Sequence, residues 1–158
     1  MEAGKNIDCY GCFPGHSIEQ ADAEQAYVQA DLTGTETWVA IPEEAWPDSW
    51  WNYPEGMDRS TREAKALRTP KYDRPCCRLL KSLYGHPDAG TMWEAHCHRC
   101  LLRQGFIPIT SWPSCYFHSR LGLMLTVCVD DFKLAGPASK LKEGWDLISS
   151  QLEVEKTN

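Results

Sequence analysis

The sequence predicts an α+β fold of the split βαβ (ferredoxin-like) kind, with an antiparallel sheet backed by helices. An apolar run over residues 121–128 stops at Asp130-Asp131 and resumes over 132–135, which is typical of a hairpin with carboxylates at its tip. Residues 89–104 carry apolar side chains three and four positions apart, as an amphipathic helix does. With an extended segment before this helix and a second amphipathic segment at the end, the elements run strand, strand, helix, hairpin, helix.

The beginning of the chain carries weak secondary-structure signals. Residues 1–17 contain Gly, Cys and Pro at short intervals and predict an irregular N-terminal tail, so the domain itself is expected over residues 18–158. Residues 18–30 are apolar or small without a clean period, and Asp22 is unusual among them. Residues 36–41 are rich in Trp and Val and predict a strand that Pro42 ends.

Residues 42–75 differ in character from the rest. They contain five prolines, together with Trp46, Trp50 and Trp51, and only residues 60–67 have a helical pattern. Structureless loops longer than about 12–15 residues are uncommon inside compact domains. We therefore interpret this segment either as an insertion packed by its own aromatic side chains or as a partly mobile flap.

The second half of the chain has clearer periodicity. The helix over 89–104 is expected to end at Gly105, and short extended pieces follow at 107–109 and 114–118. The run over 121–128 is continuous enough for a strand that is buried on both faces. After Gly136 and Pro137, residues 138–153 predict a last amphipathic helix.

Composition limits the classes of protein to which the chain can belong. Its 158 residues suffice for one domain with a real core, and 42% hydrophobic with 24% charged residues is ordinary for a globular protein. No apolar run reaches the roughly 20 residues that a membrane span needs, and the first residues lack the layout of a secretory signal. We expect an intracellular protein that has no membrane partner.

The distribution of charge leaves two interpretations open. A net charge of −6 argues against nucleic acid as a partner. However, residues 59–81 contain eight Lys or Arg and only two acidic residues, Glu63 and Asp73. This stretch is either a solvated helix face with its loop or a strip that contacts a nucleic-acid backbone.

Eight cysteines are unusual for a chain of this length without secretion signals. Two C-x-x-C pairs, Cys9 with Cys12 and Cys97 with Cys100, could each supply half of a zinc site. The pairs lie far apart in the sequence, and the second lies within a helical pattern. A zinc-stabilised module therefore stays an alternative interpretation.

Asp130 and Asp131 are the clearest candidates for chemistry. Burying a carboxylate is costly unless a cation compensates it, and two adjacent carboxylates also repel each other. The pair occupies either an exposed turn, where Asp is common, or a site that binds a cation.

Several short segments resemble, in the same order, those of copia-type LTR retrotransposon reverse transcriptases. The segment from Asp22 to Leu32 resembles D-V-K-T-A-F-L-N-G-D-L, and the segment from Glu36 to Pro42 resembles E-I-Y-M-x-Q-P. Residues 80–85 resemble L-K-K-S-L-Y-G, Trp93 falls on the family's A-P-R-x-W tryptophan, and residues 102–106 and 113–116 resemble L-x-S-L-G-F and D-P-C-L-Y. Residues 128–131 with 134–136 are similar to Y-V-D-D-x-x-I-A-G. The shared order, from Asp22 to Gly136, implies a polymerase palm that is a fragment of a Pol polyprotein.

The resemblance implies RNA-directed DNA synthesis by two-metal nucleotidyl transfer. Asp22, Asp130 and Asp131 would be the catalytic and magnesium-binding carboxylates, with Asp22 and Asp130 bridging two Mg²⁺ ions. Tyr27 falls where the family has the aromatic residue that excludes a ribose 2′-hydroxyl, although it could instead be a core tyrosine. Asp88 falls near the family's Gln, where its negative charge would face the dNTP.

The resemblance also has departures. Residues 86–91 differ from the family's L-K-Q-A-P-R, and the family's N-terminal fingers strands, remaining thumb, connection and ribonuclease H have no counterpart. The expected partners are an RNA or DNA template–primer, dNTP and those absent segments, in a cytoplasmic particle or the nucleus. Little or no primer extension is expected from the chain as given. The alternative function is that of a non-catalytic interaction module.

Overall fold

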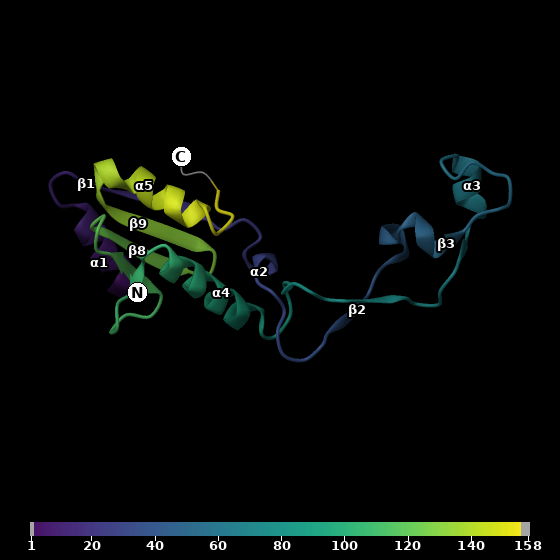
Figure 1. Cartoon of the computed structure of the whole chain (residues 1–158), viewed down its shortest axis with the longest axis horizontal. Coiled ribbons are helices and arrows are strands. Elements are labelled where there is room, and N and C mark those ends of the chain that lie inside the picture. Colours follow the sequence, from purple (N-terminus) through teal and green to yellow (C-terminus); the bar gives the residue numbers. More distant parts are fainter. Residues whose placement is uncertain (1, 156–158) are drawn as a thin grey trace. The chain divides into compact units, whose positions relative to one another are not determined.

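A computed structural model describes residues 2–155 and divides the chain into two compact units (Figure 1). Unit 1 combines the residues up to Thr33 with those from Leu80 onward, and unit 2 comprises Gly34–Leu79. Unit 2 contains the segment 42–75 that the sequence sets apart and extends beyond it at both ends.

Unit 1 contains a five-stranded antiparallel sheet, which confirms the α+β class. The strands lie in the order β1-β9-β8-β7-β6. Their bounds are β1 (His16–Asp22), β6 (Ile107–Pro108), β7 (Cys115–His118), β8 (Leu123–Cys128) and β9 (Asp131–Pro137). The hairpin predicted from the two apolar runs is the β8–β9 pair.

Helices cover both faces of this sheet. They are α1 (Glu2–Gly11), α2 (Ala26–Gln29), α4 (Ala89–Arg103) and α5 (Ala138–Ser149). The main core unites Trp93 of α4 and Trp145 of α5 with Leu125 of β8, whereas Ile7 of α1 packs against Met124 in a second cluster. Successive residues of β8 thus enter different clusters, which explains its continuous apolar run and confirms that both of its faces are buried. No helix within residues 2–155 is long and apolar enough to span a bilayer.

The prediction of an irregular tail over residues 1–17 is wrong, since α1 occupies most of this segment and β1 begins at His16. Ile7 is completely buried, Tyr10 donates a hydrogen bond to the Gly122 carbonyl at 2.9 Å, and Asp8 pairs with Lys133. Short helices are marginal by themselves and depend on tertiary packing. These contacts come from distant parts of the chain, so a local reading of residues 1–17 could not include them.

The two long helices agree with their predicted spans except at one end. Gly105, with φ +85°, follows α4 as predicted. α5 ends at Ser149, four residues before the expected 153, although Leu152 remains buried. The chain then turns back beside the end of β1, where Val154 bridges Ala23 and the Glu155 N–H donates to the Asp22 carbonyl at 2.8 Å.

Unit 2 is built from two short ladders, one α-helix and two 3₁₀ helices, η1 (Glu43–Ala45) and η2 (Asp48–Trp50). β2 (Trp38–Ala40) pairs with β5 (Cys76–Arg78), β3 (Trp51–Asn52) pairs with β4 (Thr69–Pro70), and α3 spans Arg62–Leu67. The ring of Trp46 lies 5.1 Å from that of Trp51, and the Arg68 guanidinium lies 3.9 Å from the Trp51 ring. Unit 2 is therefore packed by its own aromatic side chains, the first of the two interpretations of residues 42–75.

Part of the basic stretch over residues 59–81 is used inside the units. Arg68 stacks on Trp51, the Lys71 ammonium donates to the Ser49 carbonyl at 2.7 Å, and Arg78 pairs with Glu36 at 3.0 Å. These three cations have structural partners, which favours the solvated-face interpretation for them.

Candidate functional site

The strand register brings two of the three predicted carboxylates together. Asp22, the last residue of β1, lies directly opposite Asp131, the first residue of β9. A hydrogen bond joins the two carboxyl groups when one of them is protonated. Asp130 lies in the adjoining turn, where its carbonyl accepts from the Ala23 N–H at 2.8 Å. Asp22 thus meets Asp131 across the ladder, whereas the sequence led us to expect Asp22 and Asp130 as the bridging pair.

The electrostatics of the acidic pair favour a bound cation. Burial, the hydrogen bond with Asp22 and the charges of Asp22 and Asp130 all raise the pKa of Asp131, burial most strongly. A raised carboxyl pKa means that the surroundings disfavour the ionised form. A cation placed between these oxygens would reverse that effect.

The turn before Asp131 has a strained backbone. Val129 has φ +60°, in the left-handed region that β-branched residues rarely adopt. Such a conformation costs about 1–3 kcal/mol and persists only where neighbouring groups impose it. The indole N–H of Trp93, from α4, donates to the Val129 carbonyl at 2.6 Å. α4 therefore fixes the turn that carries the acidic residues.

A groove opens on the α1 side of the acidic pair. It is lined by Asp8, Ile18, Glu19, Gln20, Ala21, Asp22, Lys133 and Glu155. Lys133 lies opposite Gln20 in the β1–β9 ladder, so its side chain projects from the same face of the sheet as those of Asp22 and Asp131. Sequence reasoning missed Asp8, Lys133 and Glu155, which no local pattern marks, since they meet Asp22 only through the sheet and the returning C-terminal segment.

Tyr27 and Asp88 occupy other places. Tyr27, on α2, lines a cavity of about 790 Å³ with Trp93, Tyr116 and Val129, and its ring lies 4.6 Å from that of Tyr84. It therefore borders the turn at Val129 but does not line the groove that contains Asp22. Asp88 is exposed at the N-terminus of α4, where its backbone N–H donates to His86 Nδ1 at 3.2 Å.

The carboxylates suit magnesium better than the cysteines suit zinc. Mg²⁺ takes hard oxygen ligands and is commonly held by one or two carboxylates with waters, a donor set that Asp22 and Asp131 provide. Among residues 2–155, no three His, Cys, Asp or Glu side chains are arranged to hold one metal ion. Asp130 is therefore not assembled with Asp22 and Asp131 as a third ligand.

The cysteine pairs differ in their surroundings. Cys9 and Cys12 are exposed free thiols on or beside α1, while Cys97 and Cys100 are buried in α4. Burial raises the pKa of Cys97 to about 12, and among residues 2–155 neither cysteine pair belongs to a group of three or more side chains that could hold a metal ion. The zinc-module interpretation gains no support from this pair.

Comparisons with protein-family models, with curated proteins and with solved structures find no match to the chain.

Proposed function

We propose that the chain is the palm of a copia-type reverse transcriptase, with Asp22, Asp130 and Asp131 at its nucleotidyl-transfer centre. The pairing of Asp22 with Asp131 carries this proposal. Two acidic segments from distant parts of the sequence, each chosen for its resemblance to the same family, lie side by side in one sheet. Uncompensated carboxylates repel, so their meeting is unfavourable unless a cation binds there.

The arrangement of elements supports the split βαβ interpretation of the fold. Along the chain, β1 precedes α4, the β8–β9 hairpin follows, and α5 leads to the extended residues beside β1. In the sheet, β9 lies between β1 and β8, while Val154 bridges the other side of the β1 end. Both α4 and α5 contribute to the main core.

The proposed reaction joins a primer 3′-hydroxyl to the α-phosphate of a dNTP and releases pyrophosphate. Asp22 and Asp131 would hold magnesium, which when bound supplies positive charge to the phosphate oxygens. Asp130 adds negative charge beside them from the strained turn, and Trp93 holds that turn in place. By the resemblance, Tyr27, which borders the Val129 turn from the neighbouring cavity, would exclude the ribose 2′-hydroxyl by a steric clash, and Asp88 at the start of α4 would lie towards the triphosphate.

The first test of this proposal is metal binding. Calorimetric titration of the full chain with Mg²⁺ should show binding that Asp22→Asn and Asp131→Asn each weaken. Asp146→Asn is the matched control, because it removes an exposed carboxylate of α5 that pairs with Lys142. If all three variants bind Mg²⁺ as the wild type does, the acidic pair is not a metal site.

Primer extension on an RNA template tests the chemistry itself. We expect slow synthesis at most, because positioning contributes much of the catalysis of phosphoryl transfer. Any synthesis should disappear in Asp130→Asn, and Tyr27→Ala should admit ribonucleotides. Synthesis that survives Asp130→Asn contradicts the proposed centre.

A further inference from the structure

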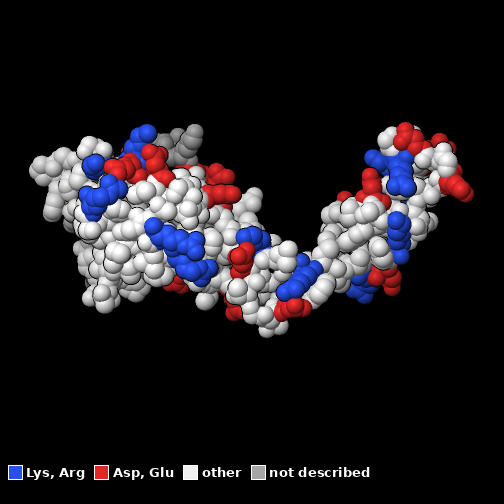
Figure 2. Space-filling model, in the orientation of Figure 1, with Lys and Arg blue, Asp and Glu red and all other residues white. Residues whose placement is uncertain are grey.

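A cationic ridge runs along α4 and the segment before it; we define it as Arg99 and Arg103 on the exposed face of α4, the half-buried His96 of the same helix, and Lys81 of the preceding segment. Arg99 and Arg103 are exposed four residues apart, and His96 lies one turn before Arg99. A helix rises about 1.5 Å per residue, so the two arginines are about 6 Å apart along its axis. Figure 2 shows a group of Lys and Arg side chains over α4, in a protein whose net charge is −6.

The ridge stands out because its arginines have no carboxylate partners. Among the described residues, neither Arg99 nor Arg103 forms an ion pair. By contrast, the other cations of unit 1 mostly do: Lys81, Arg120, Lys133, Lys140 and Lys142. Like charges four residues apart on a helix repel, so this arrangement is unfavourable until an anion binds.

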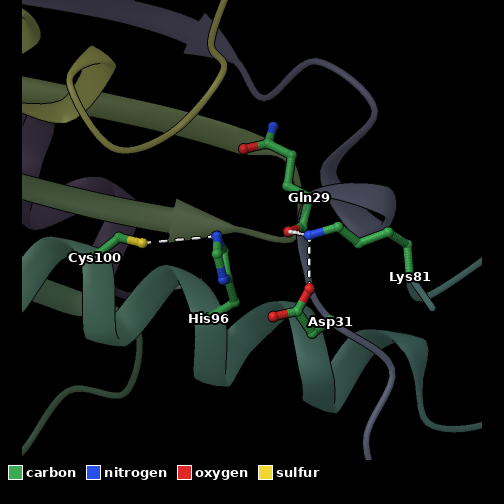
Figure 3. A network of polar contacts seen from close by, with 5 residues as sticks. All are labelled: Gln29, Asp31, Lys81, His96 and Cys100. Atoms are coloured by element: carbon green, nitrogen blue, oxygen red, sulfur yellow. Dashed lines mark hydrogen bonds and ion pairs between the residues drawn. The ribbon is translucent and has the colours of Figure 1, made fainter.

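Lys81, the third cation of the ridge, is held in place by a network of polar contacts (Figure 3). The Lys81 ammonium lies 2.7 Å from Asp31 Oδ1 and donates to the Gln29 carbonyl at 3.2 Å. His96 Nε2 lies 3.6 Å from Cys100 Sγ. Asp31 pairs with Lys81, and its charge also acts on Arg99, so that the ridge and Asp31 together carry a net charge of +2 when His96 is neutral.

The pKa of His96 is lowered by its surroundings, which include the cations of the ridge. Burial lowers the pKa of His96 most, and the charges of Arg99 and Lys81 lower it further. Arg103 acts in the same direction, and only Asp31 opposes them. Burial first, and then these cationic neighbours, favour the neutral imidazole.

We propose that the cationic ridge of α4 binds the phosphate backbone of a nucleic-acid strand. Guanidinium groups match phosphate oxygens in bidentate geometry, and the repeating phosphates of one strand can engage both arginines at once. Contacts of this kind carry no sequence information and position the strand on the protein. The choice of nucleic acid over another polyanion rests on the proposed function, but the ridge is a surface separate from the acidic groove.

The experiment measures binding of the full chain to a short fluorescent single-stranded oligodeoxynucleotide over a range of salt concentrations. The double variant Arg99→Gln/Arg103→Gln should bind at least about tenfold more weakly at low salt, and its slope of log affinity against log salt should be shallower by about 1.4 for two lost phosphate contacts. The matched control is Lys140→Gln/Lys142→Gln, which removes the same charge from α5 and should change neither quantity appreciably. In NMR titrations the wild-type His96 pKa should rise when the oligonucleotide is added.

Two further arms separate this proposal from its rivals. Asp22→Asn/Asp131→Asn should keep oligonucleotide binding. If this variant loses magnesium binding and still binds the oligonucleotide, the result bears on the proposed function and leaves the ridge proposal unaffected. Poly-glutamate should not displace the oligonucleotide at equal charge concentration, and displacement would instead identify an acidic protein surface as the partner. Absence of wild-type binding, or equal affinities of the arginine and lysine double variants, overturns the ridge proposal.

Discussion

Val129 shows how a single residue can link packing to the candidate chemistry. Its left-handed backbone conformation is unfavourable for a β-branched side chain. Val129 nevertheless adopts it at the start of the turn that contains Asp130. The bond from Trp93 compensates part of this cost and reaches the turn from α4. The sequence marked Trp93 as an apolar helix position and as part of a resemblance. Neither observation predicts the hydrogen bond from Trp93 to Val129, because that bond depends on where α4 lies against the sheet.

Trp93→Phe should weaken Mg²⁺ binding because it removes the indole N–H and keeps an aromatic ring in the core. The Val129 carbonyl then loses its donor, and we expect a destabilisation of about 1–3 kcal/mol. Trp145→Phe is the matched control, since that indole, on α5, donates its hydrogen bond to Glu19 at 2.7 Å. Urea denaturation and calorimetric titration of both variants provide the comparison. Equal losses of Mg²⁺ affinity would mean that Trp93 stabilises the fold without positioning the turn.

Asp131→Asn should raise Tm near neutral pH in the absence of metal. The folded pKa of Asp131 is raised, so its stabilising contribution is present below the unfolded pKa of about 3.8 and is lost as the pH rises through the folded value. Asparagine removes this loss, and the gain in Tm should shrink towards pH 3. Mg²⁺ should then raise the Tm of the wild type more than that of the variant.

Glu143 supplies the control of opposite sign. Its partners Lys140 and Arg120 hold its pKa below the usual range, so its contribution is present above the unfolded pKa and is lost as the pH falls through the folded value. Glu143→Gln should therefore lower Tm near neutral pH. If both variants shift Tm in the same direction across the pH range, the acidic pair is not under repulsive strain.

At the scale of elements, the sequence predicted those helices and strands whose pattern is contained in neighbouring residues. The period of α4, its stop at Gly105 and the interrupted apolar run of β8 and β9 are all visible in neighbouring residues. The register of β1 against β9 is not, because it depends on two strands from opposite halves of the chain. α1 was missed for the same reason, since Ile7 finds its partners only in the folded sheet.

Ile7→Ala tests whether α1 is an integral layer of unit 1. Ile7 is fully buried against Met124 and Ala135, so its truncation should cost about 2–5 kcal/mol of unfolding free energy. Lys5→Ala, at an exposed position of the same helix, should change stability little. Urea denaturation with a constant m-value measures both. A negligible change in the unfolding free energy of Ile7→Ala would instead favour the expectation of an irregular tail over residues 1–17.

At the scale of the whole molecule, the chain leaves unit 1 and returns to it at neighbouring points. The Leu32 N–H donates to the Leu80 carbonyl at 2.9 Å, and the Ser82 N–H donates to the Ala30 carbonyl at 2.9 Å. Asp31 and Lys81 bridge between them and also form an ion pair. The sequence suggested an insertion from its prolines and tryptophans, but these bonds, and so its limits, follow from long-range pairing.

Replacing residues 34–79 with a short Gly/Ser linker should leave unit 1 folded. The two ends are already joined by backbone hydrogen bonds, so a few flexible residues can close the gap with little strain. Unit 2 packs its aromatic residues among themselves, so its removal should not expose the main core of unit 1. Circular dichroism and cooperative thermal unfolding should resemble those of the intact chain, and the acidic pair and the cationic ridge should keep their ligands. A shortened chain that binds hydrophobic dye and unfolds without cooperativity would show instead that unit 1 depends on unit 2 for its fold.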